Sequence, residues 1–179
     1  MELYLVRHGR PAVDRSRPAH EWHLDPAYDD DVRVLRDRLP SGARWFSSPE
    51  PKAFLTARLL TEEPIEVVAG LREQERDTTD WIEDFDAVVA RAFAEPDLPA
   101  YDGWEPLART RHRVVRTLQE LLGRAGDRDL VLVGHGTAWT CLVADLTGRP
   151  PDPAAWATLA MPDVVPCGDP RGRGDMLST

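Results

Sequence analysis

The stretch Leu3-Tyr4-Leu5-Val6-Arg7-His8-Gly9 decides how the rest of the chain is interpreted. Residues 3–6 are a short apolar run, typical of a strand buried on both faces, and the run stops at two basic residues and a glycine. A second stretch of the same form, Leu130-Val131-Leu132-Val133-Gly134-His135-Gly136, lies near the other end of the chain. Ligands of open α/β sheets bind at the carboxyl ends of the strands. The two stretches therefore predict that His8 and His135 meet at one edge of a sheet.

Each of these histidines is ambiguous when it is considered alone. A single histidine after a strand is most often a loop residue with an ordinary hydrogen bond. Here both are followed by glycine, Gly9 and Gly136, and Arg7 precedes the first. Glycine lets the backbone approach a ligand and leaves its N–H group free to donate to an anion. The pair therefore favours a catalytic site for an anionic group.

Composition predicts one domain and excludes several classes of partner. The chain has 179 residues, enough for one sizeable core, which we assign to residues 1–168, with a flexible tail at 169–179. Its formal charge of −9 disfavours nucleic acid and anionic membrane surfaces as partners. No stretch is typical of a membrane span or a signal peptide, so a cytoplasmic protein is expected. Cys141 and Cys167 have no metal-ligand spacing, so no metal is expected. No feature of the sequence indicates an oligomeric state.

The remaining apolar patterns predict alternating strands and helices, and hence an α/β fold. Strands are expected at residues 43–47 and 65–68, with an edge strand within 157–165. Helices are expected at residues 29–39, 50–60, 83–93, 105–122 and 137–146. Residues 12–28 have no clear period and are expected to form a long loop, and residues 78–101, which include the predicted helix at 83–93, are expected to form an insertion or cap. Substrate specificity is expected to lie in these two segments.

Three further charged side chains follow the predicted strand ends. Lys52 lies in the first turn of the helix at 50–60, where a basic group opposes the helix dipole. This position indicates either that an anion lies between the lysine and the helix start or that the lysine is solvated. Glu73 and Glu75 follow the strand at 65–68, where a carboxylic acid can donate a proton, and either of them can equally be a surface residue. The helix that starts after His135 is a second candidate anion site.

Taken together, these motifs and their order mean that the chain resembles the histidine phosphatase (phosphoglycerate mutase-like) superfamily. The matching motifs, in family order, are Leu5-Val6-Arg7-His8-Gly9, Ser48-Pro49 with Ala53 and Thr56-Ala57, Leu71-Arg72-Glu73, and Val133-Gly134-His135-Gly136. The resemblance implies a three-layer α/β/α sandwich with a mostly parallel central sheet. It also implies a metal-independent, cofactor-free phosphatase that forms a phosphohistidine on His8. Arg7 and His135 would bind the phosphoryl group, and Glu73 would act first as acid and then as base.

The chain departs from the family pattern at two positions. Lys52 stands where the family usually has a second phosphate-binding arginine, and a lysine cannot form a bidentate fork. Asp14 stands where mutase-like members carry an asparagine, and Arg10 is placed to offset its charge. The expected phosphate-binding set is then Arg7, Gly9, Arg10, Asp14, Lys52 and Gly136. Three functions stay open: a phosphatase for a small phosphorylated substrate, a silent relative that binds a phosphorylated ligand or protein, and a mutase.

Overall fold

The computed structural model describes residues 1–171 of the 179-residue chain. Five strands form one sheet in the order β3-β2-β4-β1-β5. Their bounds are β1 Leu3–Arg7, β2 Arg44–Ser47, β3 Ile65–Val67, β4 Leu130–Gly134 and β5 Asp163–Pro166. The first four are parallel and β5 is antiparallel to β1. The predicted α/β fold with a mostly parallel sheet is confirmed.

The register of the two central strands positions the histidines. β1 and β4 pair with Leu3 opposite Leu130 and Arg7 opposite Gly134, so His8 and His135 each follow at the same level. The N–H of His8 donates to the carbonyl of Gly134 at 2.9 Å and extends the ladder by one residue. Both strands are apolar because helices cover both faces of the sheet.

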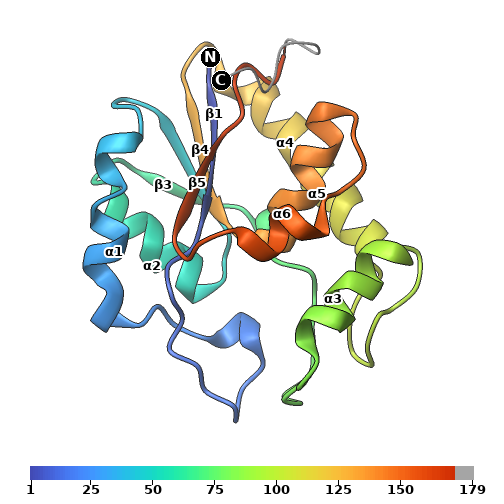
Figure 1. Cartoon of the computed structure of the whole chain (residues 1–179). Helices are drawn as coiled ribbons and strands as arrows, with labels where there is room; N and C mark the ends of the chain where they lie inside the picture. Colours follow the sequence, from blue (N-terminus) through green and yellow to red (C-terminus); the bar gives the residue numbers. More distant parts are fainter. Residues whose placement is uncertain (172–179) are drawn as a thin grey trace.

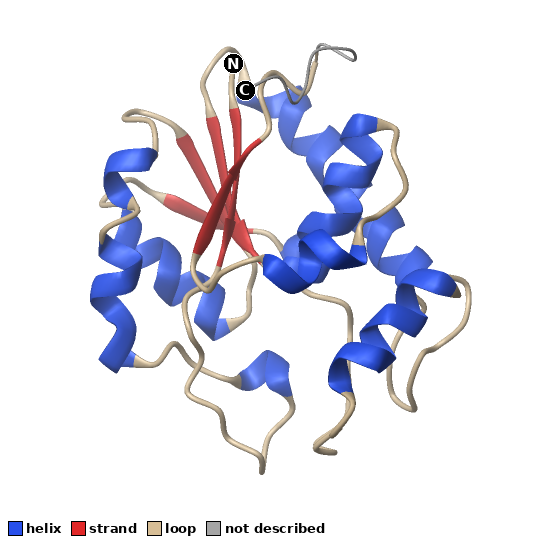
Figure 2. Ribbon diagram, viewed as in Figure 1, coloured by secondary structure: helices blue, strands red, loops and turns tan. Residues whose placement is uncertain are grey.

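Helices lie on the two faces of this sheet (Figure 1, Figure 2). The short α1 (Asp29–Arg33) and α2 (Pro51–Leu60) cover one face, and α3 (Phe85–Ala94), α4 (Leu107–Ala125), α5 (Gly136–Thr147) and α6 (Pro153–Thr158) lie on the other. Four 3-10 turns lie at Ala19–Glu21, Pro26–Tyr28, Arg36–Arg38 and Ala69–Leu71. Each face has its own apolar cluster, one packed around Trp139 and the other around Trp45. The layers are those of the predicted α/β/α sandwich.

Two predicted elements differ from the structure. The helix expected over residues 29–39 is α1 followed by a 3-10 turn, because Val32 and Leu35 are buried but Val34 is 68% exposed and adds no packing. Instead of an edge strand beginning near residue 157, the chain forms α6 there, and β5 begins only at Asp163. The side chain of Asp152 explains α6, since it accepts from the N–H groups of Ala154 and Ala155.

The segment at 78–101 contributes to the main core. Val89 and Ala92 of α3 are fully buried in the cluster around Trp139. The predicted tail lies outside the described residues from 172 onward. Among residues 1–171, no helix is both long enough and apolar enough to span a bilayer.

Candidate active site

The two histidines at the strand ends contact each other. Their ring centroids are 5.2 Å apart and their planes are inclined by 63°. His8 is 6% exposed and His135 is fully buried. The prediction that the rings meet at one edge of the sheet is confirmed.

His8 is held as a neutral imidazole with a defined tautomer. Its Nδ1 is 2.7 Å from the carbonyl oxygen of Gly9, which can only accept, so Nδ1 carries the proton and Nε2 has the free lone pair. Burial, together with the neighbouring His135 and the charge of Lys52, places the pKa of His8 well below its ordinary value. A neutral ring with a free Nε2 is suited to nucleophilic attack.

The N–H of Gly9 already has a partner within the protein, and the residue is tightly packed. Its N–H donates to Oγ1 of Thr56 on α2 at 3.0 Å, so the expectation that this N–H is free for an anion is wrong. A side chain here would also be excluded, because a Cβ atom would lie 2.7 Å from atoms of Leu24 and Val32. Glycine therefore lets the loop after β1 pack closely against α1.

His135 is also neutral, and its Nε2 has two partners. Nε2 lies 2.8 Å from Oγ of Ser48 and 3.3 Å from Oε1 of Glu50. Burial, assisted by the charge of Lys52, lowers the pKa of His135 to about 3. Its Nδ1 is buried and has no partner among residues 1–171.

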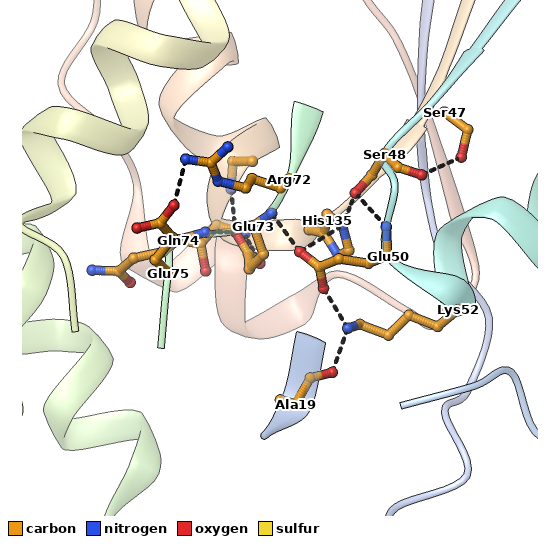
Figure 3. A network of polar contacts seen from close by, with 12 residues as sticks. Ala19, Ser47, Ser48, Glu50, Lys52, Arg72, Glu73, Gln74, Glu75 and His135 are labelled. Carbon is orange, nitrogen blue, oxygen red and sulfur yellow. Dashed lines mark hydrogen bonds and ion pairs between the residues drawn. The ribbon is translucent and has the colours of Figure 1, made fainter. Parts of the chain in front are cut away.

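Glu50 is the functional residue that the sequence analysis missed. Figure 3 shows its carboxylate between Lys52 and His135. Oε2 lies 2.5 Å from Nζ of Lys52, and Oε1 accepts from the N–H of Glu73 at 2.8 Å. Lys52 also donates to the carbonyl of Ala19 at 2.7 Å, so its ammonium binds protein oxygens on two sides. The only available signal was a glutamate two residues before a lysine at a helix start.

Glu73 occupies the N-terminus of α5, the anion site predicted from the sequence. Its carboxylate accepts from the N–H groups of Thr137 at 3.1 Å, Ala138 at 2.9 Å and Gln74 at 3.0 Å. The positive end of the helix dipole and these three donors together hold the side chain of Glu73 at the helix start. Glu75, the alternative acid, is exposed and pairs with Arg72. Of the two acids, only Glu73 lies beside the first turn of α5.

Arg7 lies on the other side of this turn. Its Nη1 donates to the carbonyl of Leu159 at 2.5 Å, and its buried Nε has no partner among residues 1–171. A Cβ atom on Gly136 would be 3.1 Å from that Nε, so glycine lets the guanidinium approach the helix start. Burial lowers the pKa of Arg7, and the charges of Glu73 and Asp163 act in the opposite direction.

Arg10 and Asp14 are not brought to the histidines. The guanidinium of Arg10 stacks on the ring of Tyr28, 4.6 Å from its centroid. The exposed carboxylate of Asp14 accepts from the N–H and hydroxyl of Ser16, at 2.9 and 2.6 Å, because it stabilises a local turn. The expectation that these two residues line the phosphate site therefore finds no support in their contacts.

A pocket of about 620 Å³ opens beside this centre. It is lined by His20, Pro49, Glu50, Arg72, Glu73, Gln74, Glu75, Arg76 and Asp77. Glu50 and Glu73 thus connect the histidine pair with a larger space that can hold the remainder of a substrate. Within residues 1–171, no three His, Cys, Asp or Glu side chains are grouped to hold a metal ion.

Comparisons with known proteins agree with this arrangement. Residues 3–163 match the family model described as histidine phosphatase superfamily (branch 1). Among solved structures, a mycobacterial glucosyl-3-phosphoglycerate phosphatase is 20% identical, with coverage of 89% of this chain and 84% of that chain and a TM-score of 0.70. A phosphoserine phosphatase from Entamoeba histolytica is 15% identical, with coverage of 92% and 89% and a TM-score of 0.73. A protein from Thermus thermophilus is 26% identical, with coverage of 100% and 99% and a TM-score of 0.69. No curated protein matched the chain.

Proposed function

Because the chain belongs to the histidine phosphatase superfamily, we propose that it hydrolyses a small phosphomonoester, without a metal, through a phosphohistidine on His8. The observation that carries this proposal is the state of His8 itself. Its ring is buried and neutral, its Nδ1 proton is held by Gly9, and its free Nε2 lies beside a second imidazole. Neutral imidazole is the nucleophilic form of histidine.

In the first step, Nε2 of His8 forms a bond to phosphorus while the bond to the ester oxygen breaks. The transferring phosphoryl group carries spread negative charge, which Arg7 and His135 would bind. Glu73 gives its proton to the departing oxygen, so the alcohol leaves neutral. This role requires a protonated Glu73 in the substrate complex, whereas in the free protein its oxygens accept three backbone N–H groups.

In the second step, water attacks phosphorus and the bond to Nε2 breaks. Glu73 is now a carboxylate and accepts the proton that the water loses. His8 returns to its neutral form and inorganic phosphate is released, so the cycle is balanced. Removing Glu73 should therefore slow the hydrolysis of esters with poor leaving groups most, because the departure of these groups depends most on protonation.

The test is phosphate release from 4-nitrophenyl phosphate in EDTA between pH 5 and 7.5. We expect turnover by the unaltered protein and a loss of about 1,000-fold or more in His8→Gln. The exposed His112→Gln serves as the matched control and should keep full activity. Absence of release by the unaltered protein across this pH range would contradict the proposal.

One observation favours a second function, a silent relative that binds a phosphorylated ligand. Glu50 pairs with Lys52 and lies 3.3 Å from Nε2 of His135, so these two groups are less available to stabilise the charge of a transferring phosphoryl group. Rapid transfer of phosphate to His8 from a phosphoryl donor such as phosphoramidate would rule this function out. Ligand binding without such labelling would favour it.

A further inference from the structure

Arg76 is a charged side chain in the pocket that the proposed reaction does not use. It follows Glu73 by three residues, and its backbone forms an isolated antiparallel bridge with Trp104. Its guanidinium stacks on the ring of Trp104 at 4.3 Å and on that of Phe85 at 5.1 Å from the ring centroids. The two rings and the bridge hold the guanidinium in one place.

The polar contacts of this guanidinium are incomplete. Nη2 donates to Oγ1 of Thr137 at 3.0 Å and to Oε1 of Gln74 at 3.3 Å, and both acceptors are neutral. Nε is buried without a partner, and Nη1 has no hydrogen bond to any of residues 1–171. Within the same residues, no carboxylate lies in ion-pair distance of Arg76. The side chain of Arg76 is half-buried, and a buried Nε without an acceptor is costly, so this arrangement favours an added acceptor such as an anion.

The carboxylates of the pocket wall are accounted for by other contacts. Glu50 binds Lys52, Glu75 binds Arg72, and Glu73 accepts three backbone N–H groups at the start of α5. Asp77 is exposed to solvent. Arg76 is thus a cation of the pocket wall with no carboxylate of residues 1–171 in ion-pair distance, and the charges of Glu73 and Glu50 act on it from farther away.

The position of Arg76 relative to Glu73 indicates which part of a substrate it would contact. Arg76 and Glu73 are joined through Thr137, whose hydroxyl accepts from the arginine and whose N–H donates to the glutamate. Arg76 lines the 620 Å³ pocket together with Glu73, whereas His8 and Arg7 do not. If Glu73 protonates the departing oxygen, the pocket beyond it receives the group attached to that oxygen.

We propose that Arg76 binds an anionic group, such as a carboxylate, on the leaving-group side of the substrate. The preferred substrates are then phosphate esters of hydroxy acids and not esters of neutral alcohols. A guanidinium held against two rings suits this role, because its Nη1 has no acceptor among residues 1–171 and can donate a charge-assisted hydrogen bond to a carboxylate. The substrate class named here rests on the proposed phosphatase function. The anion site at Arg76 does not depend on that function.

The experiment compares 2-phosphoglycolate with ethyl phosphate, two esters that differ in one carboxylate. We expect the unaltered protein to prefer 2-phosphoglycolate by about 10- to 100-fold in kcat/KM, the range for one charge-assisted contact. Arg76→Met keeps the apolar stem against Trp104 and Phe85 and should remove the preference, with hydrolysis of ethyl phosphate changed less than about threefold. Arg76→Lys should retain part of it. Arg109→Gln, an exposed arginine of α4, is the control.

Binding of the non-hydrolysable 3-phosphonopropionate and propylphosphonate, measured by calorimetry, separates this inference from the proposed function. Tighter binding of the carboxylate compound by the unaltered protein, lost in Arg76→Met, supports the anion site even if no ester is hydrolysed. Equal affinities and equal kcat/KM values for the two compounds of each pair would overturn the inference, and hydrolysis of both esters would then leave the phosphatase function standing.

Discussion

Glu50 places a carboxylate where a phosphoryl group would need cations and donors. Its oxygens bind Nζ of Lys52 and the N–H of Glu73, and one of them lies 3.3 Å from Nε2 of His135. All three are groups that can also bind a phosphoryl oxygen. Glu50 and a phosphate dianion therefore compete for the same donors, and the carboxylate adds repulsion.

The variant Glu50→Gln tests this competition. Removing the charge should lower the dissociation constant of inorganic phosphate by about tenfold, since Lys52 gains a free charge while the amide oxygen still accepts from Glu73. The variant should also be less stable by about 1–3 kcal/mol without phosphate, because a buried ammonium loses its ionic partner. Calorimetric phosphate titration and thermal unfolding measure both effects.

The exposed Glu62→Gln is the matched control, since it removes the same charge far from any buried partner. It should change neither phosphate affinity nor stability appreciably. Unchanged or weaker phosphate binding by Glu50→Gln would show that Glu50 does not compete with the ligand.

These side chains also mark what the sequence could predict. His8 and His135 each follow an apolar strand. The carboxyl ends of parallel strands lie at the same edge of a sheet, so the proximity of the two histidines could be predicted. Glu50 and Arg76 carry no such pattern. Besides the adjacent Lys52, their environments are made by Ala19, Thr137 and Trp104, which come from three other parts of the chain.

Among the helices, α5 does most to organise the site. Its first turn binds the Glu73 carboxylate on one side and contacts the guanidinium of Arg7 on the other. Gly136 makes the second contact possible, because a methyl group there would lie 3.1 Å from Nε and 3.3 Å from Cζ of Arg7.

Gly136→Ala should therefore separate activity from stability. The methyl group displaces Arg7 by a few tenths of an ångström or more, and we expect kcat/KM for 4-nitrophenyl phosphate to fall by about 10- to 100-fold. Alanine is the better helix former, so the melting temperature should stay the same or rise. Steady-state kinetics and thermal unfolding of the same preparation provide the two readings.

Gly123→Ala in α4 is the control, because a Cβ atom there meets nothing within 4 Å. It should raise stability by about 0.5–1 kcal/mol and leave kinetics unchanged. If Gly136→Ala retained full activity, the position of Arg7 would not limit phosphoryl transfer.

The long elements could be predicted and the short ones could not. The apolar stripe of α4 and the apolar runs of β1 and β4 repeat often enough to identify a helix and two buried strands. α1 and α6 have five and six residues, so their ends depend on a few contacts and on the cap at Asp152. Short segments of this kind are set by tertiary packing more than by local pattern.

For the chain as a single cooperative unit, the site is a source of instability in acid. His8 and His135 are buried and neutral, with Lys52 contributing to the lowered pKa of both, so neither takes up a proton easily in the folded state. Histidines in the unfolded chain are protonated near pH 6.5. Between pH 6.5 and about 3, the unfolded state therefore binds more protons than the folded state, and stability falls as the pH falls.

Urea unfolding at pH 7 and pH 5 tests this linkage. His135 should cost about 2 kcal/mol over that interval, since one pKa unit corresponds to about 1.4 kcal/mol, and His8 should add a cost of the same sign. His135→Gln removes one of the two groups, so its loss of stability between pH 7 and pH 5 should be smaller than that of the unaltered protein by about this amount. The exposed His112→Gln should reproduce the loss of the unaltered protein, and carboxylates elsewhere affect all three proteins alike. If the free energy of unfolding of His135→Gln and of the unaltered protein fell equally between pH 7 and pH 5, His135 would already be protonated in the folded chain near pH 5. The neutral histidine pair on which the proposed chemistry depends would then be wrong.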